Sequence, residues 1–166
     1  HPEFAFLPRK FKIAISGARE DRAAIAWHDV GLELQRNAAG EVGFRVLVGG
    51  GMGRTPIVGS EIRAFVPWQQ ILLYLEAVVR VYNRFGRRDN LYKARIKILV
   101  KAEGQKYFDA VNAEFDKIMS RDVSGASQLI PQAELDRVAA SFARPAGVQP
   151  RADVPLAADA PLALRR

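Results

Sequence analysis

The stretch PWQQILLYLEAVVRVYNRFG, residues 67–86, separates two kinds of hydrophobic pattern in this chain of 166 residues. Its apolar side chains recur three and four positions apart, which is typical of a helix with one buried face. These side chains are Trp68, Ile71, Leu72, Leu75, Val78, Val79, Tyr82 and Phe85. Pro67 precedes them and Gly86 follows them, as is usual at the two ends of a helix. The stretch therefore predicts a helix.

Before this helix the pattern indicates strands. Residues 11–15 alternate in hydrophobicity, so we expect Phe11, Ile13 and Ile15 to face the core. Residues 32–36 and 44–48 flank a turn that ends at Gly40, which predicts a hairpin. Residues 61–66 form a fourth extended segment.

After this helix the pattern indicates further helices at residues 91–100, at residues 105–119 and from Pro131 onward. Strands first and helices afterwards predict an α+β fold, in which helices pack on one face of a mixed, mostly antiparallel sheet. We expect residues 1–143 to form one domain and residues 144–166, rich in Pro and Ala, to form a linker or extended tail. The first residues are His-Pro-Glu-Phe rather than Met, which suggests a fragment of a longer protein.

The composition narrows the classes of ligand. A net charge of +7 and a pI near 10 indicate an acidic partner such as phosphate, nucleic acid, anionic lipid or a polyanionic cofactor. The absence of cysteine excludes a disulfide scaffold, a thiolate zinc site and an iron–sulfur cluster bound by this chain. With two histidines, a metal site is not expected. The longest apolar stretches are far shorter than the ~20 residues of a membrane span, so we expect a cytoplasmic protein.

Cations cluster at one end of the first strand. Lys10 and Lys12 are two residues apart, which places both ammonium groups on one face of a strand. This run alone fits a solvated strand face better than an anion site. Later in the chain, Arg95 and Lys97 are also two apart. They can hold one ligand from two sides only if their helix starts late or is irregular.

The loop VGGGMGRTP, residues 48–56, suits close approach of an anion to backbone amides. It matches neither a dinucleotide fingerprint nor a Walker loop. Arg54 and Thr55 favour a carboxylate or phosphate ligand over a purely structural loop. A nucleic-acid ligand is not expected, since Tyr82, Phe85 and Tyr92 fit a core role better than a stacking role.

Three motifs in this order resemble the sirohaem-dependent sulfite and nitrite reductases: LPRKFK at residues 7–12, the loop at 48–56 and NLYKARIK at residues 90–97. The resemblance covers about residues 1–120 and is closest to the first half of the haemoprotein beta subunit. It implies that Lys10 and Lys12 hold the substrate anion and deliver protons. It also implies contacts to the cofactor from Arg9, Gly49, Gly50, Gly51, Met52, Arg54, Thr55, Arg95 and Lys97.

The resemblance further implies an enzyme that reduces sulfite to sulfide, or nitrite to ammonia, with sirohaem and a [4Fe–4S] cluster. The cluster's cysteines belong to the second half of the family's polypeptide, which would be a partner of this chain together with a flavoprotein or ferredoxin electron donor. The alternative is a non-catalytic basic module that binds polyanions such as nucleic acid. The residues do not distinguish sulfite from nitrite.

We expect the isolated 166-residue chain to fold without sirohaem and to be inactive, because it carries no cluster ligands. Its absorbance spectrum after purification should lack the Soret and Q bands of sirohaem. Intense bands from bound cofactor would contradict this prediction.

Overall fold

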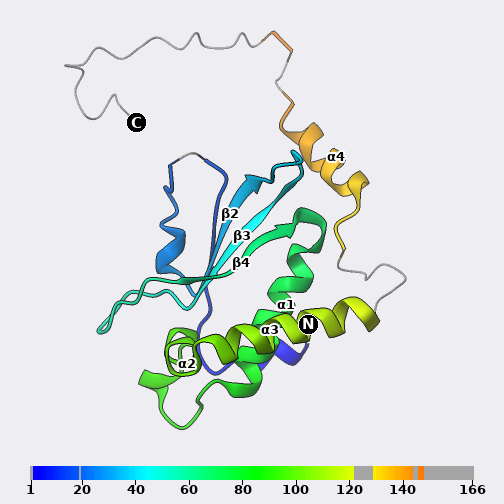
Figure 1. The fold of residues 1–166 in the computed structure, drawn as a ribbon. Helices are drawn as coiled ribbons and strands as arrows, with labels where there is room; N and C mark the ends of the chain where they lie inside the picture. Colours follow the sequence, from blue (N-terminus) through cyan, green and yellow to red (C-terminus); the bar gives the residue numbers. More distant parts are fainter. Residues whose placement is uncertain (1, 19, 122–128, 144–145, 148–166) are drawn as a thin grey trace, which may run out of the picture. The chain divides into compact units, whose positions relative to one another are not determined.

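A single four-stranded sheet organises residues 1–131, the first of two compact units in the computed structural model (Figure 1). The structure describes residues 2–18, 20–121, 129–143 and 146–147. The strands lie in the order β1 (Ile13–Ser16), β2 (Val30–Arg36), β3 (Val42–Val48) and β4 (Ser60–Pro67). β1 pairs parallel with β2, and the other two pairs are antiparallel. The prediction of a mixed, mostly antiparallel sheet is confirmed.

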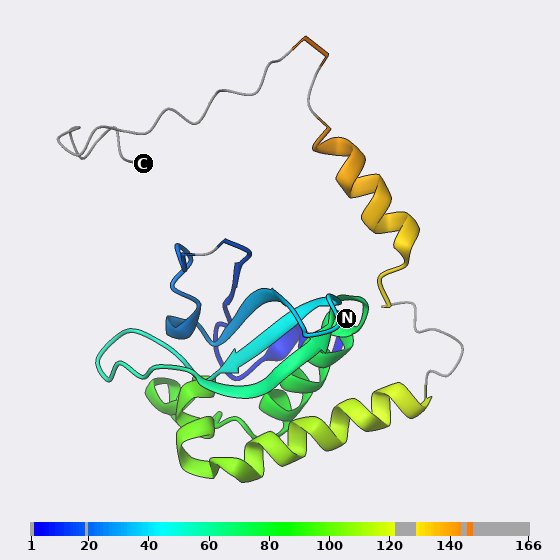
Figure 2. The ribbon, with the colours of Figure 1, turned by 45° about the horizontal axis from the view of Figure 1, so that its top comes forward.

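Three helices of this unit cover one face of the sheet (Figures 1 and 2). They are α1 (Ile71–Phe85), α2 (Ile96–Glu103) and α3 (Gln105–Arg121). Short 3₁₀ turns complete the unit: η1 (Pro2–Phe6), η2 (Ile25–Trp27), η3 (Trp68–Gln70) and η4 (Leu91–Lys93). The α+β prediction is therefore confirmed. Within the described residues, no helix has the length and apolar character needed to cross a membrane.

The second unit, residues 132–166, contains α4 (Gln132–Ser141), which confirms the helix predicted after Pro131. Apart from Ala146 and Gly147, the predicted Pro/Ala-rich tail at residues 144–166 lies outside the described residues.

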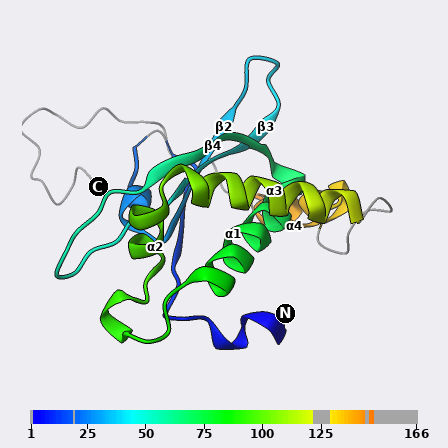
Figure 3. The ribbon, with the colours of Figure 1, turned by 60° about the horizontal axis from the view of Figure 1, so that its bottom comes forward.

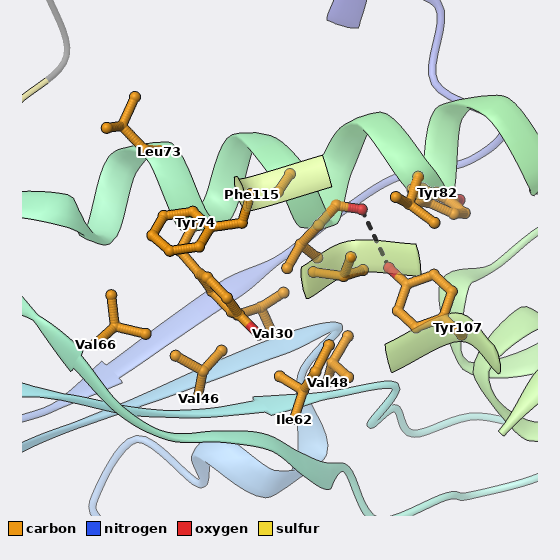
Figure 4. Close-up of a cluster of buried hydrophobic side chains, with 14 of the residues drawn as sticks. Val30, Val46, Val48, Ile62, Val66, Leu73, Tyr74, Tyr82, Tyr107 and Phe115 are labelled. Atoms are coloured by element: carbon orange, nitrogen blue, oxygen red, sulfur yellow. Dashed lines mark hydrogen bonds between the residues drawn. The ribbon is translucent and has the colours of Figure 1, made fainter. Parts of the chain in front are cut away.

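The main core lies between the sheet and the three helices (Figure 4). Val46 and Val48 of β3 are fully buried there, as is Tyr74 of α1. The ring of Tyr74 meets that of Phe115 edge to face, with centroids 5.1 Å apart. The Tyr107 hydroxyl donates a hydrogen bond of 3.1 Å to the Val78 carbonyl, which gives this buried polar group a partner. Both contacts join α1 to α3 on this face of the sheet.

The predicted burial of β1 is wrong in part. Ile13 and Ile15 are 43% and 60% exposed, although Phe11 packs against the core and stacks on Tyr82. β1 is an edge strand, so the helices that bury Val30 and Leu32 do not cover the neighbouring side chains of β1. Ala14 and Ser16 are the buried residues of β1 instead, and Ala14 lies in a small cluster with Ile25 and Leu47.

The predicted helix at residues 91–100 is also corrected. Residues 91–93 form the 3₁₀ turn η4, and the α-helix begins at Ile96. Tyr92 is 90% exposed and Phe85 is 56% exposed, so neither is a core residue as predicted, whereas Tyr82 is fully buried. The late helix start leaves Arg95 at the N-cap position and Lys97 in the first turn.

Leu32→Ala should lower the free energy of unfolding by about 2–5 kcal/mol, because Leu32 is buried at the centre of the core. Leu34→Ala, two residues along the same strand, is the matched control. Leu34 is 42% exposed, so its loss should cost about 1 kcal/mol or less. Denaturant unfolding of both variants measures the difference. Equal losses would contradict this description of the core.

Candidate functional site

A cleft of about 560 Å³ opens where three segments of the chain meet. These are the segment before β1, the loop between β3 and β4, and the segment that leads into α2. The lining residues are Arg9, Lys10, Lys12, Met52, Gly53, Arg54, Thr55, Leu91, Tyr92, Lys93, Arg95, Lys97 and Ile98. Seven of them are lysine or arginine, and none is acidic. Cations from distant parts of the sequence thus face one space.

The segment before β1 contributes Arg9, Lys10 and Lys12. The strand begins only at Ile13, so the two lysines reach the cleft from an extended segment rather than from a strand face. Both lysines are exposed, and Arg9 is half-buried. The Arg9 guanidinium donates to the Leu91 carbonyl over 2.5 Å. This bond ties the first wall of the cleft to the segment that leads into α2.

Asp29, which directly precedes β2, connects all three walls. Its side chain is completely buried behind the cleft. Oδ2 accepts the backbone N–H of Lys12 at 3.0 Å, and Oδ1 accepts from Nη2 and Nε of Arg95 at 2.8 and 3.3 Å. The Asp29 carbonyl also accepts the N–H of Gly49 at 2.9 Å. Sequence reasoning missed Asp29, because a single acid between His28 and Val30 carries no pattern that distinguishes it.

Lys97 differs from the other cations because its charge is used inside the protein. Its Nζ donates to the carbonyls of Met52 at 3.1 Å and Thr55 at 2.5 Å, with Gly51 O at 3.5 Å. The side chain is buried, and this burial, together with the neighbouring charge of Arg95, lowers the pKa of Lys97. Lys97 therefore holds the loop in place. The backbone of the loop between β3 and β4 runs beside α2 (Figure 3).

The three glycines at residues 49–51 are buried and do not line the cleft. Gly49 has a φ of +82°, and a Cβ there would lie 2.8 Å from Val100. A Cβ on Gly51 would lie 2.8 Å from the Arg95 guanidinium. The glycines therefore allow close packing under the loop, and Met52, Arg54 and Thr55 provide its part of the lining.

The charge in the cleft favours an anionic ligand. Like charges gathered in one space repel each other unless solvent or a counter-charge lies between them. Arg95 has five N–H groups, of which Asp29 takes two and Met52 O takes one at 3.3 Å. Two donors therefore remain without a partner among the described residues. The described residues do not indicate a metal ligand for this cleft, since they hold no group of three or more His, Asp or Glu that could bind a metal ion.

Lys97→Met should release the loop, since it removes a charged donor from two close carbonyls. Amide hydrogen exchange at residues 51–57 should speed up by about tenfold or more, which corresponds to ~1.4 kcal/mol of local stability. Lys101→Met, one turn later on α2 and exposed, is the control and should leave the loop unchanged. Unchanged exchange in Lys97→Met would show that these hydrogen bonds do not hold the loop.

Comparison with known proteins adds evolutionary evidence to this geometry. Residues 1–118 match the family model described as "Nitrite and sulphite reductase 4Fe-4S domain". "Sulfite reductase [ferredoxin]" of Synechococcus elongatus is 36% identical over 123 residues, which are 69% of this chain and 20% of that protein. "Sulfite reductase [NADPH] hemoprotein beta-component" of Myxococcus xanthus is 34% identical over 63% of this chain and 20% of its own length. The chain thus spans about a fifth of the length of these curated relatives.

A solved structure agrees with these sequence matches. The structure titled "Structure of Mycobacterium tuberculosis NirA protein" aligns with a TM-score of 0.63 and 33% identity. The alignment covers 70% of this chain and 21% of that one. The family match covers more than half of the chain, and the chain therefore belongs to the nitrite and sulphite reductase 4Fe-4S domain family.

Proposed function

We propose that this chain supplies contacts to the substrate anion and to sirohaem in a sulfite or nitrite reductase. The reaction of the whole enzyme is the six-electron reduction of sulfite to sulfide or of nitrite to ammonia. The observation that carries the proposal is the cleft, whose described lining residues include seven cations and no acid. The names of the two curated relatives support sulfite as the first substrate to test.

Sirohaem and a [4Fe–4S] cluster are characteristic of this family, and the residues of this chain fit only the first of them. Sirohaem is a polycarboxylate, and guanidinium groups bind carboxylates through paired hydrogen bonds. Arg9, Arg54 and Arg95 offer such groups in the cleft. The cluster requires thiolates, and this chain has no cysteine. In this proposal the second half of a longer polypeptide holds the cluster.

When bound, sirohaem supplies the redox chemistry, while the residues of this chain bind the anions and supply protons. The exposed ammonium groups of Lys10 and Lys12 hold the substrate oxyanion and can donate protons to it from Nζ. Their positive charge stabilises the bound anion, and a proton passed from Nζ to an oxygen of the substrate lets that oxygen leave as water. Met52, Arg54 and Thr55, which line the cleft from the loop, would contact the cofactor.

The remaining residues with proposed cofactor roles affect the cofactor indirectly, through the position of the loop. Lys97 fixes the loop through its carbonyls, so its contribution to cofactor binding is indirect. Gly49, Gly50 and Gly51 let the loop pack closely against its neighbours. A Cβ on Gly50, for example, would lie 2.3 Å from the Ala26 carbonyl oxygen.

The proposal includes an electron donor, either a ferredoxin or a flavoprotein, because the relatives named above are ferredoxin and NADPH enzymes. It also includes a cytoplasmic location. The alternative of a non-catalytic polyanion-binding module is not favoured by the family membership.

Lys12→Met, made in the longer protein proposed here, should lower kcat/KM for sulfite by about 100-fold or more, because a charged donor at the oxyanion is lost. Reduced methyl viologen can serve as the electron donor, and the sirohaem spectrum should stay unchanged. Lys117→Met, an exposed lysine of α3 outside the cleft, is the matched control and should keep full activity. Equal activity of the two variants would refute the role of Lys12.

A further inference from the structure

We infer that Asp29 is a positioning residue, which sets the anion-binding geometry of Lys12 and Arg95 although it does not line the cleft. The inference rests on the proposed function, since it concerns how that cleft binds its oxyanion. Asp29 is not among the lining residues, and it accepts hydrogen bonds from the Lys12 backbone amide and from the Arg95 guanidinium.

The buried charge of Asp29 needs partners. A carboxylate that is fully removed from water is strongly unfavourable unless it is paired and hydrogen-bonded. Asp29 has both kinds of partner, in Arg95 and in the Lys12 amide. Its two oxygens accept from different walls of the cleft, so any movement of one wall relative to the other breaks a hydrogen bond of a buried charge.

Asp29 also orients the Arg95 guanidinium. Asp29 takes N–H groups on one edge of the Arg95 guanidinium, Nε and Nη2, and Met52 O takes one from Nη1. These contacts fix the plane of the guanidinium. Gly51 is matched to this plane, because a Cβ there would lie 2.8–3.0 Å from three guanidinium atoms. The two remaining N–H donors of Arg95 are thereby held in one orientation, which lowers the entropy lost when an anion binds.

The sign of the predicted effect separates positioning from simple electrostatics. A negative charge beside cations weakens their attraction for an anion, so Asp29→Asn would strengthen anion binding if charge alone mattered. If Asp29 positions Lys12 and Arg95, its loss should weaken binding instead.

A sulfite titration of the full 166-residue chain, monitored by NMR, tests whether Asp29 positions Lys12 and Arg95. Asp29→Asn should weaken sulfite binding about three- to tenfold, and it should cause a smaller loss in an Arg95→Gln background, where only the positioning of Lys12 remains to be lost. Gly51→Ala, which leaves Asp29 intact but crowds the guanidinium, should weaken binding in the same range. Asp109→Asn removes an exposed acid of α3 and should leave the affinity unchanged. Equal or tighter binding by both Asp29→Asn and Gly51→Ala would overturn the inference.

A second readout does not depend on anion binding. In Asp29→Asn, the Lys12 amide should exchange faster and the Arg95 Nε–H signal should shift, while core amides such as that of Val46 stay protected. Unchanged Lys12 and Arg95 signals would overturn the positioning role even if sulfite binds. Changed signals in a chain that binds no sulfite would support the positioning role and count against the proposed function.

Discussion

The carboxylate of Asp29 is completely buried, and the arrangement of the site depends on how that charge is satisfied. A buried charge tolerates few arrangements, because it needs both a counter-ion and hydrogen bonds. Here the side chain takes Arg95 and the Lys12 amide, and the backbone carbonyl takes the Gly49 amide. Three segments that are far apart in the sequence are fixed at one point, directly behind the cleft.

The fold supports this point through the start of β2. α1–α3 cover one face of the sheet (Figure 2), and Val30, the residue after Asp29, is fully buried in the main core. The loop after β3 has no such cover on the side of the cleft, where Met52 and Arg54 are exposed. Lys97 replaces packing with hydrogen bonds to the loop carbonyls. A rigid base and a separately anchored loop together form a cleft that leaves most of its cations accessible.

Sequence patterns predict the elements of this fold well and their boundaries less well. The apolar stripe of residues 68–85 predicts α1 because one face of that helix meets the core, and burial imposes the period. The same reasoning fails for Ile13 and Ile15, since the period of a strand does not reveal whether a neighbour covers its apolar face. It also extends α2 backwards, because η4 and a helix have similar spacing over one turn.

The residues of the site also divide into those that sequence patterns predict and those that they do not. Eight of the eleven residues named from sequence line one cleft, because exposed cations and a glycine loop leave visible patterns. The other three, Gly49–Gly51, lie beneath it, since the sequence does not show which side of a loop faces outward. Asp29 could not be found from sequence, because its importance lies in contacts with residues 17 and 66 positions away.

In the function proposed above, the cations of the cleft form a single anion site. The most direct test is a sulfite titration of the isotope-labelled chain, in which NMR signals of individual lysines and arginines are followed. Signals of Lys10, Lys12 and Arg95 should shift together and saturate with one dissociation constant, while those of Arg36 and Arg45, which lie outside the cleft, should not saturate. Shifts that spread over all cations without saturation would contradict the claim.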